Sequence, residues 1–221
     1  MLAETGMHEN VWYSLVCILI GYLFGCIATG YFVGKKNNVD IQKEGSGNPG
    51  ATNALRIMGL KSGLITLIGD LIKSLIPCLL VRHVFFPGFV GTGYGWFSTE
   101  YYVLLTGLAA VIGHNYPSWL RFKGGKGIST SAGVMFALNL PMTGILAVIL
   151  FSVIGISKYV SLGSITVLVF VPILIGVFYP GKWVLVVLGA VFMIIGWWRH
   201  RANIGRLLHG NENRLSVGGK K

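Results

Sequence analysis

Long apolar segments alternate with short polar, glycine-rich segments along this chain. A helix needs about 20 predominantly apolar residues to cross the ~30 Å hydrocarbon core of a membrane. The apolar segments are Val11–Gly34, Gly63–Phe85, Tyr101–Trp119, Ile128–Leu138, Met142–Ser157, Val160–Phe178 and Trp183–Trp198. The pattern therefore predicts an all-α polytopic membrane protein with about seven transmembrane helices, arranged as a single membrane domain over residues 1–221.

The fourth apolar segment, Ile128–Leu138, has only about half the length that a spanning helix needs. It meets the fifth segment at Asn139 and Pro141, so the two segments could form one bent pair or a re-entrant hairpin. The length of this segment therefore leaves a count of five or six spans open.

Composition strengthens the membrane interpretation. Hydrophobic residues make up 53% of the chain and charged residues 11%, whereas soluble domains carry about 25% charged residues. The 18 Lys and Arg residues outnumber the 7 Asp and Glu residues, which gives a net charge of +11. Because the basic residues lie between apolar segments, they indicate loops beside anionic lipid rather than nucleic-acid binding. The cysteines Cys17, Cys26 and Cys78 all fall in apolar segments, so we expect inert thiols.

The placement of the basic residues predicts the orientation. With the N-terminal tail, residues 1–10, outside, the inner segments are 35–62, 120–127, 158–159 and 199–221. They hold five, three, one and six Lys and Arg residues, which is 15 of the 18. Cytoplasmic loops carry such an excess of positive charge. We therefore expect the C-terminus in the cytoplasm and three substantial polar segments, 35–62, 120–127 and 199–221, at the inner face.

The first polar segment contains the sequence EGSGNPGATN, residues 44–53. Asn48 before a proline is typical of a helix start, and the apolar spacing that follows predicts a short interfacial helix ending near Gly59. Its free N–H groups, with Ser46, Thr52 and Asn53, would surround an anion, and Arg56 would supply positive charge. A flexible loop before a well-capped helix is the plainer alternative.

The second polar segment contains KGGKG, which is Lys123, Gly124, Gly125, Lys126 and Gly127. Glycine N–H groups beside two lysines, followed by a helix start, are typical of a phosphate-binding loop. The spacing does not match the P-loop of nucleotide hydrolases. A solvated basic loop is the alternative, and His114 before it could be a hydrogen-bonded structural residue.

The third polar segment follows the last apolar stretch directly. If that helix continues, His200 and Asn203 lie on one face, three residues apart. A basic anchor for anionic lipid would explain the arginines around them, but explains these two residues less well. Inside the second apolar segment, Asp70 and Lys73 are also three residues apart, and we expect a structural ion pair because buried membrane charges are usually paired. No metal-ligand cluster stands out, so we expect no metal or other cofactor.

Three long segments resemble the signature motifs of the bacterial membrane acyl-phosphate:glycerol-3-phosphate acyltransferase family, PlsY. They are GSGNPGATNALRIMG at 45–59, GHNYPSWLRFKGGKG at 113–127 and RHRANIGRLLHGNENR at 199–214. The segment GDLIKSLIP at 69–77 resembles the family's Asp–Lys segment. The resemblance covers about residues 11–214.

The resemblance implies a seven-helix protein of the bacterial inner membrane with its active site at the cytoplasmic face. It implies transfer of a fatty acyl group from acyl phosphate to the 1-hydroxyl of sn-glycerol 3-phosphate, giving lysophosphatidic acid and phosphate. The partners would be these two substrates and membrane lipid, and we expect a monomer. The resemblance also implies substrate assistance, in which the donor's phosphate takes the hydroxyl proton; His200 is the second candidate for the base.

The resemblance assigns residues as well. Catalytic positions fall on Ser46, His200 and Asn203. Substrate-binding positions fall on Asn48, Thr52, Asn53, Arg56, His114, Lys123, Gly124, Gly125, Lys126 and Gly127. Glu212 is expected to support the structure, as are Asp70 and Lys73 from their position.

Two other classes of function compete with an acyltransferase. An organic-phosphate transporter would also need basic loops, but it would place charged residues near the membrane midplane. A structural or lipid-binding protein would leave the asparagine- and glycine-rich segments without a purpose. The H-x-x-x-x-D pattern of a different acyltransferase class is absent, because no Asp follows any His by five residues.

Overall fold

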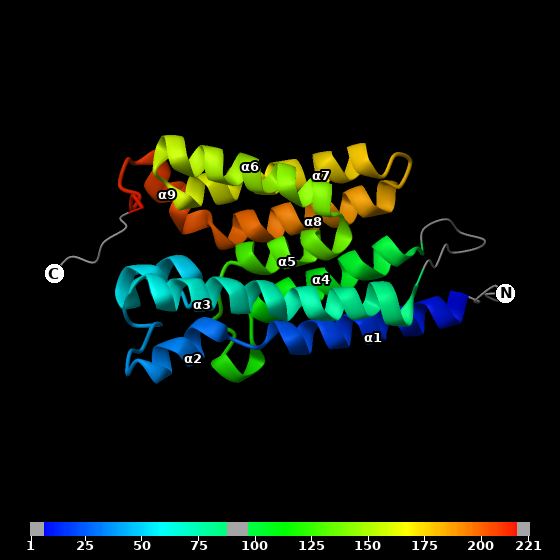
Figure 1. The fold of residues 1–221 in the computed structure, drawn as a ribbon, viewed down its shortest axis with the longest axis horizontal. Helices are drawn as coiled ribbons and strands as arrows, with labels where there is room; N and C mark the ends of the chain where they lie inside the picture. Colours follow the sequence, from blue (N-terminus) through cyan, green and yellow to red (C-terminus); the bar gives the residue numbers. More distant parts are fainter. Residues whose placement is uncertain (1–6, 88–96, 216–221) are drawn as a thin grey trace.

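The protein is a bundle of helices in the computed structural model, which describes residues 7–87 and 97–215 (Figure 1). The helices are α1 (Met7–Gly25), α2 (Thr29–Lys36), α3 (Ala51–Leu80), α4 (Thr99–Asn115), α5 (Ile128–Leu138), α6 (Leu140–Ser157), α7 (Val160–Phe178), α8 (Trp183–Arg199) and α9 (Arg201–Leu208). A π-helical turn, Val81–Phe85, extends α3, and a 3₁₀ turn, Ser118–Leu120, follows α4. The all-α prediction is confirmed over the described residues.

Two groups of helices build the bundle. Helix α1 packs along α4 and α3 packs along α5, while α6, α7 and α8 form a second layer that α8 joins to α4. The buried core is apolar. Within the first group, for example, the rings of Phe86 and Tyr102 stack with centroids 4.2 Å apart. The outer surface is also apolar, with Ile156 86% exposed and Val148 66% exposed. Such a surface suits lipid rather than water.

Over residues 7–87 and 97–215, four helical segments are long and apolar enough to cross a membrane by themselves: His8–Lys36, Ala51–Phe85, Leu140–Ser157 and Val160–Phe178. A fifth appears if α8 and α9, which are bent by 63°, count as one broken span. The multi-pass membrane character is therefore confirmed, and the count of seven stays a prediction.

Several predicted helix ends differ from the structure. The first apolar segment is broken after Gly25, so α1 and α2 are separate helices. Helix α3 begins at Ala51 with Gly50 as its N-cap, and the Asn48 side chain instead accepts a hydrogen bond from Gly50 N at 2.8 Å. Helix α4 ends at Asn115 rather than Trp119, since Pro117 disfavours helical geometry in the residue before it.

Gly59 divides the long helix α3 into two parts. Its φ of 81° is left-handed, and the helix changes direction there. The predicted end of a short helix near Gly59 is therefore right in position, although a second helical part begins directly afterwards. The first part, from Ala51, carries Thr52, Asn53 and Arg56 of the first polar segment, and the second part enters the apolar bundle.

The short helix α5 is stabilised at its C-terminal end by neighbouring side chains. Arg82 donates to the carbonyl oxygens of Ala137 at 2.9 Å and Leu138 at 2.6 Å at the helix C-terminus, where carbonyl groups lack intrahelical partners. The Tyr179 hydroxyl also donates to Leu138 O, at 3.0 Å. The Asn139 side chain then caps α6 by accepting from Met142 N. An internal arginine therefore lets an 11-residue helix end inside the bundle.

Candidate functional site

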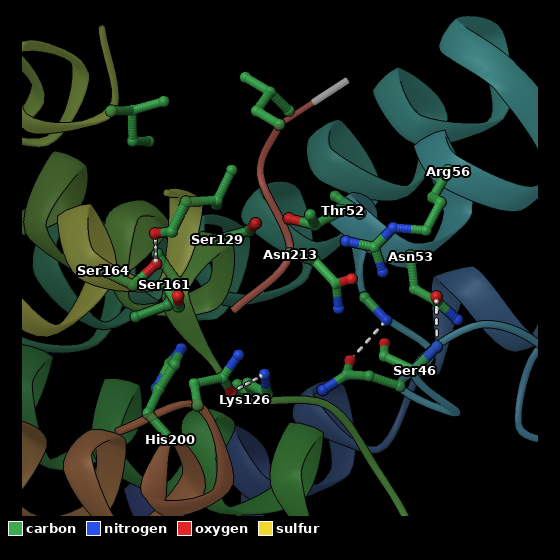
Figure 2. Close-up of a pocket in the computed structure, with 18 of the residues that line it drawn as sticks. Ser46, Thr52, Asn53, Arg56, Lys126, Ser129, Ser161, Ser164, His200 and Asn213 are labelled. Carbon is green, nitrogen blue, oxygen red and sulfur yellow. Dashed lines mark hydrogen bonds between the residues drawn. The ribbon is translucent and has the colours of Figure 1, made fainter. Parts of the chain in front are cut away.

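The three polar segments meet in one cavity of about 240 Å³ (Figure 2). It lies between the start of α3, the start of α5, α7 and the bend between α8 and α9. Of the residues that the sequence singled out, the lining contains Ser46, Asn48, Thr52, Asn53, Arg56, Asp70, His114, Lys126, Gly127, His200, Asn203 and Glu212. Residues more than 150 positions apart thus share one site.

Asn53 shapes the loop before α3. Its side chain is 2% exposed, accepts a hydrogen bond from Ser46 N at 3.0 Å and donates to Glu44 O at 3.0 Å and Ile41 O at 3.3 Å. The amide is therefore occupied by the loop, and Asn53 holds Ser46 at the cavity rather than offering a free group. Thr52 and Arg56, one turn apart, remain exposed toward the cavity, as Figure 2 shows.

The KGGKG loop differs from the predicted phosphate-binding arrangement. Gly124 N donates to Asn115 O and Gly125 N to His114 O, so these N–H groups are not free for an anion. The cavity lining includes Lys126 and Gly127 of this loop, but not Lys123, Gly124 or Gly125. A Cβ on Gly125 would lie 2.0 Å from His114 Nε2, so this glycine is needed for close packing against His114.

Arg199 fixes the same loop from the other side. Its Nε donates to Gly125 O and its Nη2 to Gly124 O, each at 2.9 Å. The guanidinium also lies 5.0 Å from the centre of the Tyr116 ring, a cation–π contact. The N–H and C=O groups of both glycines therefore have hydrogen-bond partners, and the loop is held in one position between α4 and α8.

Lys126 reaches into the cavity and begins a chain of polar contacts. Its Nζ donates to Asn203 Oδ1, and Asn203 Nδ2 donates to Glu212 Oε1 at 2.8 Å. Glu212 Oε2 in turn pairs with Arg206 Nε at 2.8 Å. Burial, and then the nearby Arg206 guanidinium, lower the pKa of Lys126 to about 8. The chain joins the second polar segment to the third.

His200 lies at the bend that follows α8. It is 3% exposed, and its Nδ1 lies 2.8 Å from Gly196 O. A carbonyl oxygen only accepts, so Nδ1 carries the hydrogen and Nε2 is left as an acceptor. Burial, and then the Lys126 ammonium, lower the pKa of His200 to about 4. The bend replaces the predicted continuous helix, yet both His200 and Asn203 still line the cavity.

The expected ion pair of Asp70 and Lys73 is confirmed. The two groups lie 3.0 Å apart and are 2% and 3% exposed. Lys73 Nζ also lies 2.7 Å from His114 Nδ1 and donates to Ile27 O at 2.7 Å. The carbonyl of Ile27 is in the break between α1 and α2, so this buried cluster ties that break to α3 and α4.

The sequence analysis missed several residues of the cavity. Ser129, Ser161, Ser164 and Asn213 are among its lining residues, and Figure 2 shows Asn213 between the α3 side and the α7 side. Ser161 and Ser164 are three residues apart in a mostly apolar helix, which was a signal in the sequence. Within the described residues, the buried Ser161 hydroxyl has no hydrogen-bond partner.

The far wall of the cavity is apolar. Leu67 of α3, Leu150, Phe151 and Ile154 of α6, and Val160 of α7 line it. Phe151 is 67% exposed on the outer surface of the bundle, so the wall continues to the lipid-facing side. The site can therefore hold a ligand with a charged end and a long apolar end.

Comparison with known proteins shows the family of this chain. A model of the family described as glycerol-3-phosphate acyltransferase matches residues 15–210. This chain belongs to the glycerol-3-phosphate acyltransferase family. The glycerol-3-phosphate acyltransferase of Geotalea daltonii is 41% identical over 201 residues, covering 90% of this chain and 96% of that protein. The one from Shouchella clausii is 38% identical over 218 residues, covering 94% and 97%.

Solved structures of the family have the same fold. PlsY (YgiH), described as an integral membrane glycerol 3-phosphate acyltransferase, aligns in its glycerol 3-phosphate form with a TM-score of 0.79 and 34% identity, covering 92% of this chain and 96% of the other. Its lysophosphatidic acid form aligns with a TM-score of 0.76 over the same shares. The resemblance to the PlsY family in the sequence is thereby confirmed.

Proposed function

We propose that this protein transfers a fatty acyl group from acyl phosphate to the 1-hydroxyl of sn-glycerol 3-phosphate, giving lysophosphatidic acid and inorganic phosphate. The observation that carries the proposal is a single cavity whose cationic polar end meets an apolar wall open toward lipid. Its relatives named glycerol-3-phosphate acyltransferase support the acceptor, and the motif resemblance supports the donor.

The polar end suits two phosphate groups. Arg56, Lys126 and Arg206 all line it, together with Ser46 and Thr52 hydroxyls. Arg214 also lines the cavity, but it donates to the Tyr159 hydroxyl at 3.4 Å. Arg206 is already paired with Glu212, so Arg56 and Lys126 are the stronger candidates for phosphate contacts. Charge-assisted hydrogen bonds to phosphate are about twice as strong as neutral ones. Gly127 is the N-cap of α5, and the positive end of that helix adds to the attraction.

The proposed reaction is a direct transfer without an acyl-enzyme intermediate. The acceptor hydroxyl oxygen bonds to the acyl carbonyl carbon, the carbon–oxygen bond to the phosphate breaks, and the hydroxyl proton moves to a phosphate oxygen of the donor. Phosphate is a good leaving group, so the site's task is to position the two substrates and stabilise charge.

The low pKa of His200 and the pairing of the nearby carboxylates support substrate assistance. His200, with a pKa near 4, is a weak proton acceptor, and its neutral Nε2 suits a hydrogen bond to the hydroxyl. Glu212 is engaged by Asn203 and Arg206, and Asp70 by Lys73. The donor phosphate is the remaining base at the reacting atoms.

The membrane arrangement is part of the proposal. We place the N-terminus outside, count seven crossings, and put the cavity at the cytoplasmic face of a bacterial inner membrane, in a monomer. The start of α3, α9 and α2 lie at the end of the bundle opposite the start of α1, as Figure 1 shows. A site at one end of the bundle is unlike the midplane site of a transporter.

The test uses purified full-length protein in detergent with glycerol 3-phosphate and, in turn, acyl phosphate, acyl-CoA and acyl carrier protein as donors. Lysophosphatidate should form with acyl phosphate alone. Formation with acyl-CoA alone would overturn the proposed donor. Uptake of glycerol 3-phosphate into vesicles, without product from any donor, would favour an organic-phosphate transporter.

A further inference from the structure

A second cavity, of about 700 Å³, lies outside the candidate active site. It is formed by α2, the loop of residues 38–43 and the segment 119–123 after α4. No residue of it lines the first cavity. Figure 1 shows α2 and the turn after α4 at the same end of the bundle as α9.

The second cavity is strongly basic. Its charged lining residues are Lys35, Asp40, Lys43, Arg121 and Lys123. Asp40 pairs with Lys43 at 3.2 Å. Within the described part of the chain, Lys35, Arg121 and Lys123 have no acidic partner within salt-bridge distance. Three unpaired cations around one hollow repel each other, and a bound anion would remove that repulsion.

Aromatic side chains place this cavity beside the membrane surface. Trp119 lines it together with Tyr31, and their rings meet edge to face at 5.4 Å. Phe32, 51% exposed, stacks on Trp119 at 5.4 Å, and Phe122, next to the cavity, is 60% exposed. Trp and Tyr are enriched at the level of lipid headgroups. Exposed apolar rings and unpaired cations therefore occupy the same narrow zone.

We propose that this basic cavity, formed by α2, residues 38–43 and residues 119–123, binds the phosphate-bearing headgroup of an anionic phospholipid. Lys35, Arg121 and Lys123 contact the phosphate, while Trp119 and Phe32 contact the upper part of the acyl chains. A soluble phosphate compound shares the charge but has no chains to cover these exposed rings, so the lipid is the better match.

A ligand in the basic cavity would also stabilise the contact between residues 38–43 and residues 119–123. Gln42 Nε2 donates to Lys123 O at 2.7 Å, which joins the two segments that line the basic cavity. The neighbouring Ile41 O accepts from Asn53 of the first cavity. Binding to both segments adds to this link, so an anionic headgroup should raise the temperature at which the protein unfolds.

The test compares two double variants that remove the same charge. Lys35→Gln with Arg121→Asn alters the basic cavity; asparagine suits position 121 because its φ is 54°. Lys36→Gln with Lys61→Gln is the matched control. Lys36 of α2 and Lys61 of α3 are both exposed, and neither lines the basic cavity. Native mass spectrometry in detergent counts phosphatidylglycerol bound to each variant, with phosphatidylcholine as the zwitterionic comparison.

We expect the cavity variant to bind phosphatidylglycerol at least tenfold more weakly than the wild type and to lose its thermal stabilisation by this lipid. The control variant should keep both. Equal loss in the two variants would show a general charge effect and overturn the site. Stabilisation by inorganic phosphate or glycerol 3-phosphate that depends on Lys35 and Arg121, without any effect of phosphatidylglycerol, would overturn the lipid as the ligand.

Discussion

The Nε of Arg199 lies 2.9 Å from the carbonyl oxygen of Gly125 and donates a hydrogen bond to it. This contact joins the end of α8 to the glycine loop, while the loop's own N–H groups bond back to the end of α4. The glycines that were expected to wrap a phosphate are therefore held from two sides. Their rigidity fixes where Lys126 enters the cavity.

Arg199→Lys should lower kcat/KM by roughly ten- to a hundredfold, because small misplacements of a site group can cost about that much. A lysine cannot bond both carbonyls in the fork geometry of arginine. Steady-state assays with glycerol 3-phosphate measure the loss. Arg201→Lys is the control, since Arg201 is exposed and contacts Trp198, by a hydrogen bond to its carbonyl oxygen and over its ring, rather than the glycine loop. Equal losses in both variants would contradict the positioning role.

The activity should depend on pH through Lys126, whose pKa is lowered to about 8. Below this pH the ammonium is charged and attracts phosphate; above it the charge is lost. The KM of a phosphate substrate bound by Lys126 should therefore rise above about pH 8, by up to ~10-fold per pH unit. Lys126→Arg should abolish this rise, because arginine stays charged. A rise of equal size in this variant would show that another group is responsible.

Ser161→Ala should weaken the enzyme more than Ser164→Ala. The buried Ser161 hydroxyl lines the cavity without a partner among the described residues, whereas Ser164 Oγ donates to Val160 O at 2.9 Å. One hydrogen bond to substrate contributes about 1 kcal/mol, so kcat/KM should fall about fivefold for Ser161→Ala and by less than about twofold for Ser164→Ala. Equal small effects would mean that the Ser161 hydroxyl does not contact substrate.

Arg82→Leu should destabilise the protein by about 1.5–3 kcal/mol, because it removes the charged donor from Ala137 O at the end of α5, while Leu138 O keeps the Tyr179 hydroxyl. Unfolding in detergent, followed by circular dichroism, measures the change. His83→Leu is the control, since His83 is exposed and adjacent. A loss for Arg82→Leu no larger than that of the control would mean that the cap is dispensable.

The activity should not need a metal ion. Arg56 and Lys126 line the polar end of the cavity and can supply the positive charge that phosphate groups need. Treatment with EDTA, followed by dialysis, should leave the rate unchanged. A rate that vanishes with the chelator and returns with Mg²⁺ would contradict this expectation.

Much of the site was predictable because its residue types are unusual for their surroundings. Polar motifs in an apolar chain pointed to Ser46, Arg56, Lys126, His200 and Asn203, and all five line one cavity. The roles within the site were less predictable. Asn53 was expected to contact substrate, but three backbone groups of the preceding loop occupy its amide. These partners lie 7 to 12 residues before it, and only the fold of the loop brings them to the side chain.

The sequence alone determined the membrane class, the helical content and the family motifs, because hydrophobic length and residue type are properties of short stretches of chain. Only the tertiary structure decided which donors remain free. The N–H groups of Gly124 and Gly125 donate to carbonyl oxygens at the end of α4. Arg82 donates to a carbonyl oxygen at the end of α5, and Ser161 lines the cavity. Hydrogen-bond partners must be satisfied in three dimensions, so a motif's free groups appear only when its distant neighbours are in place.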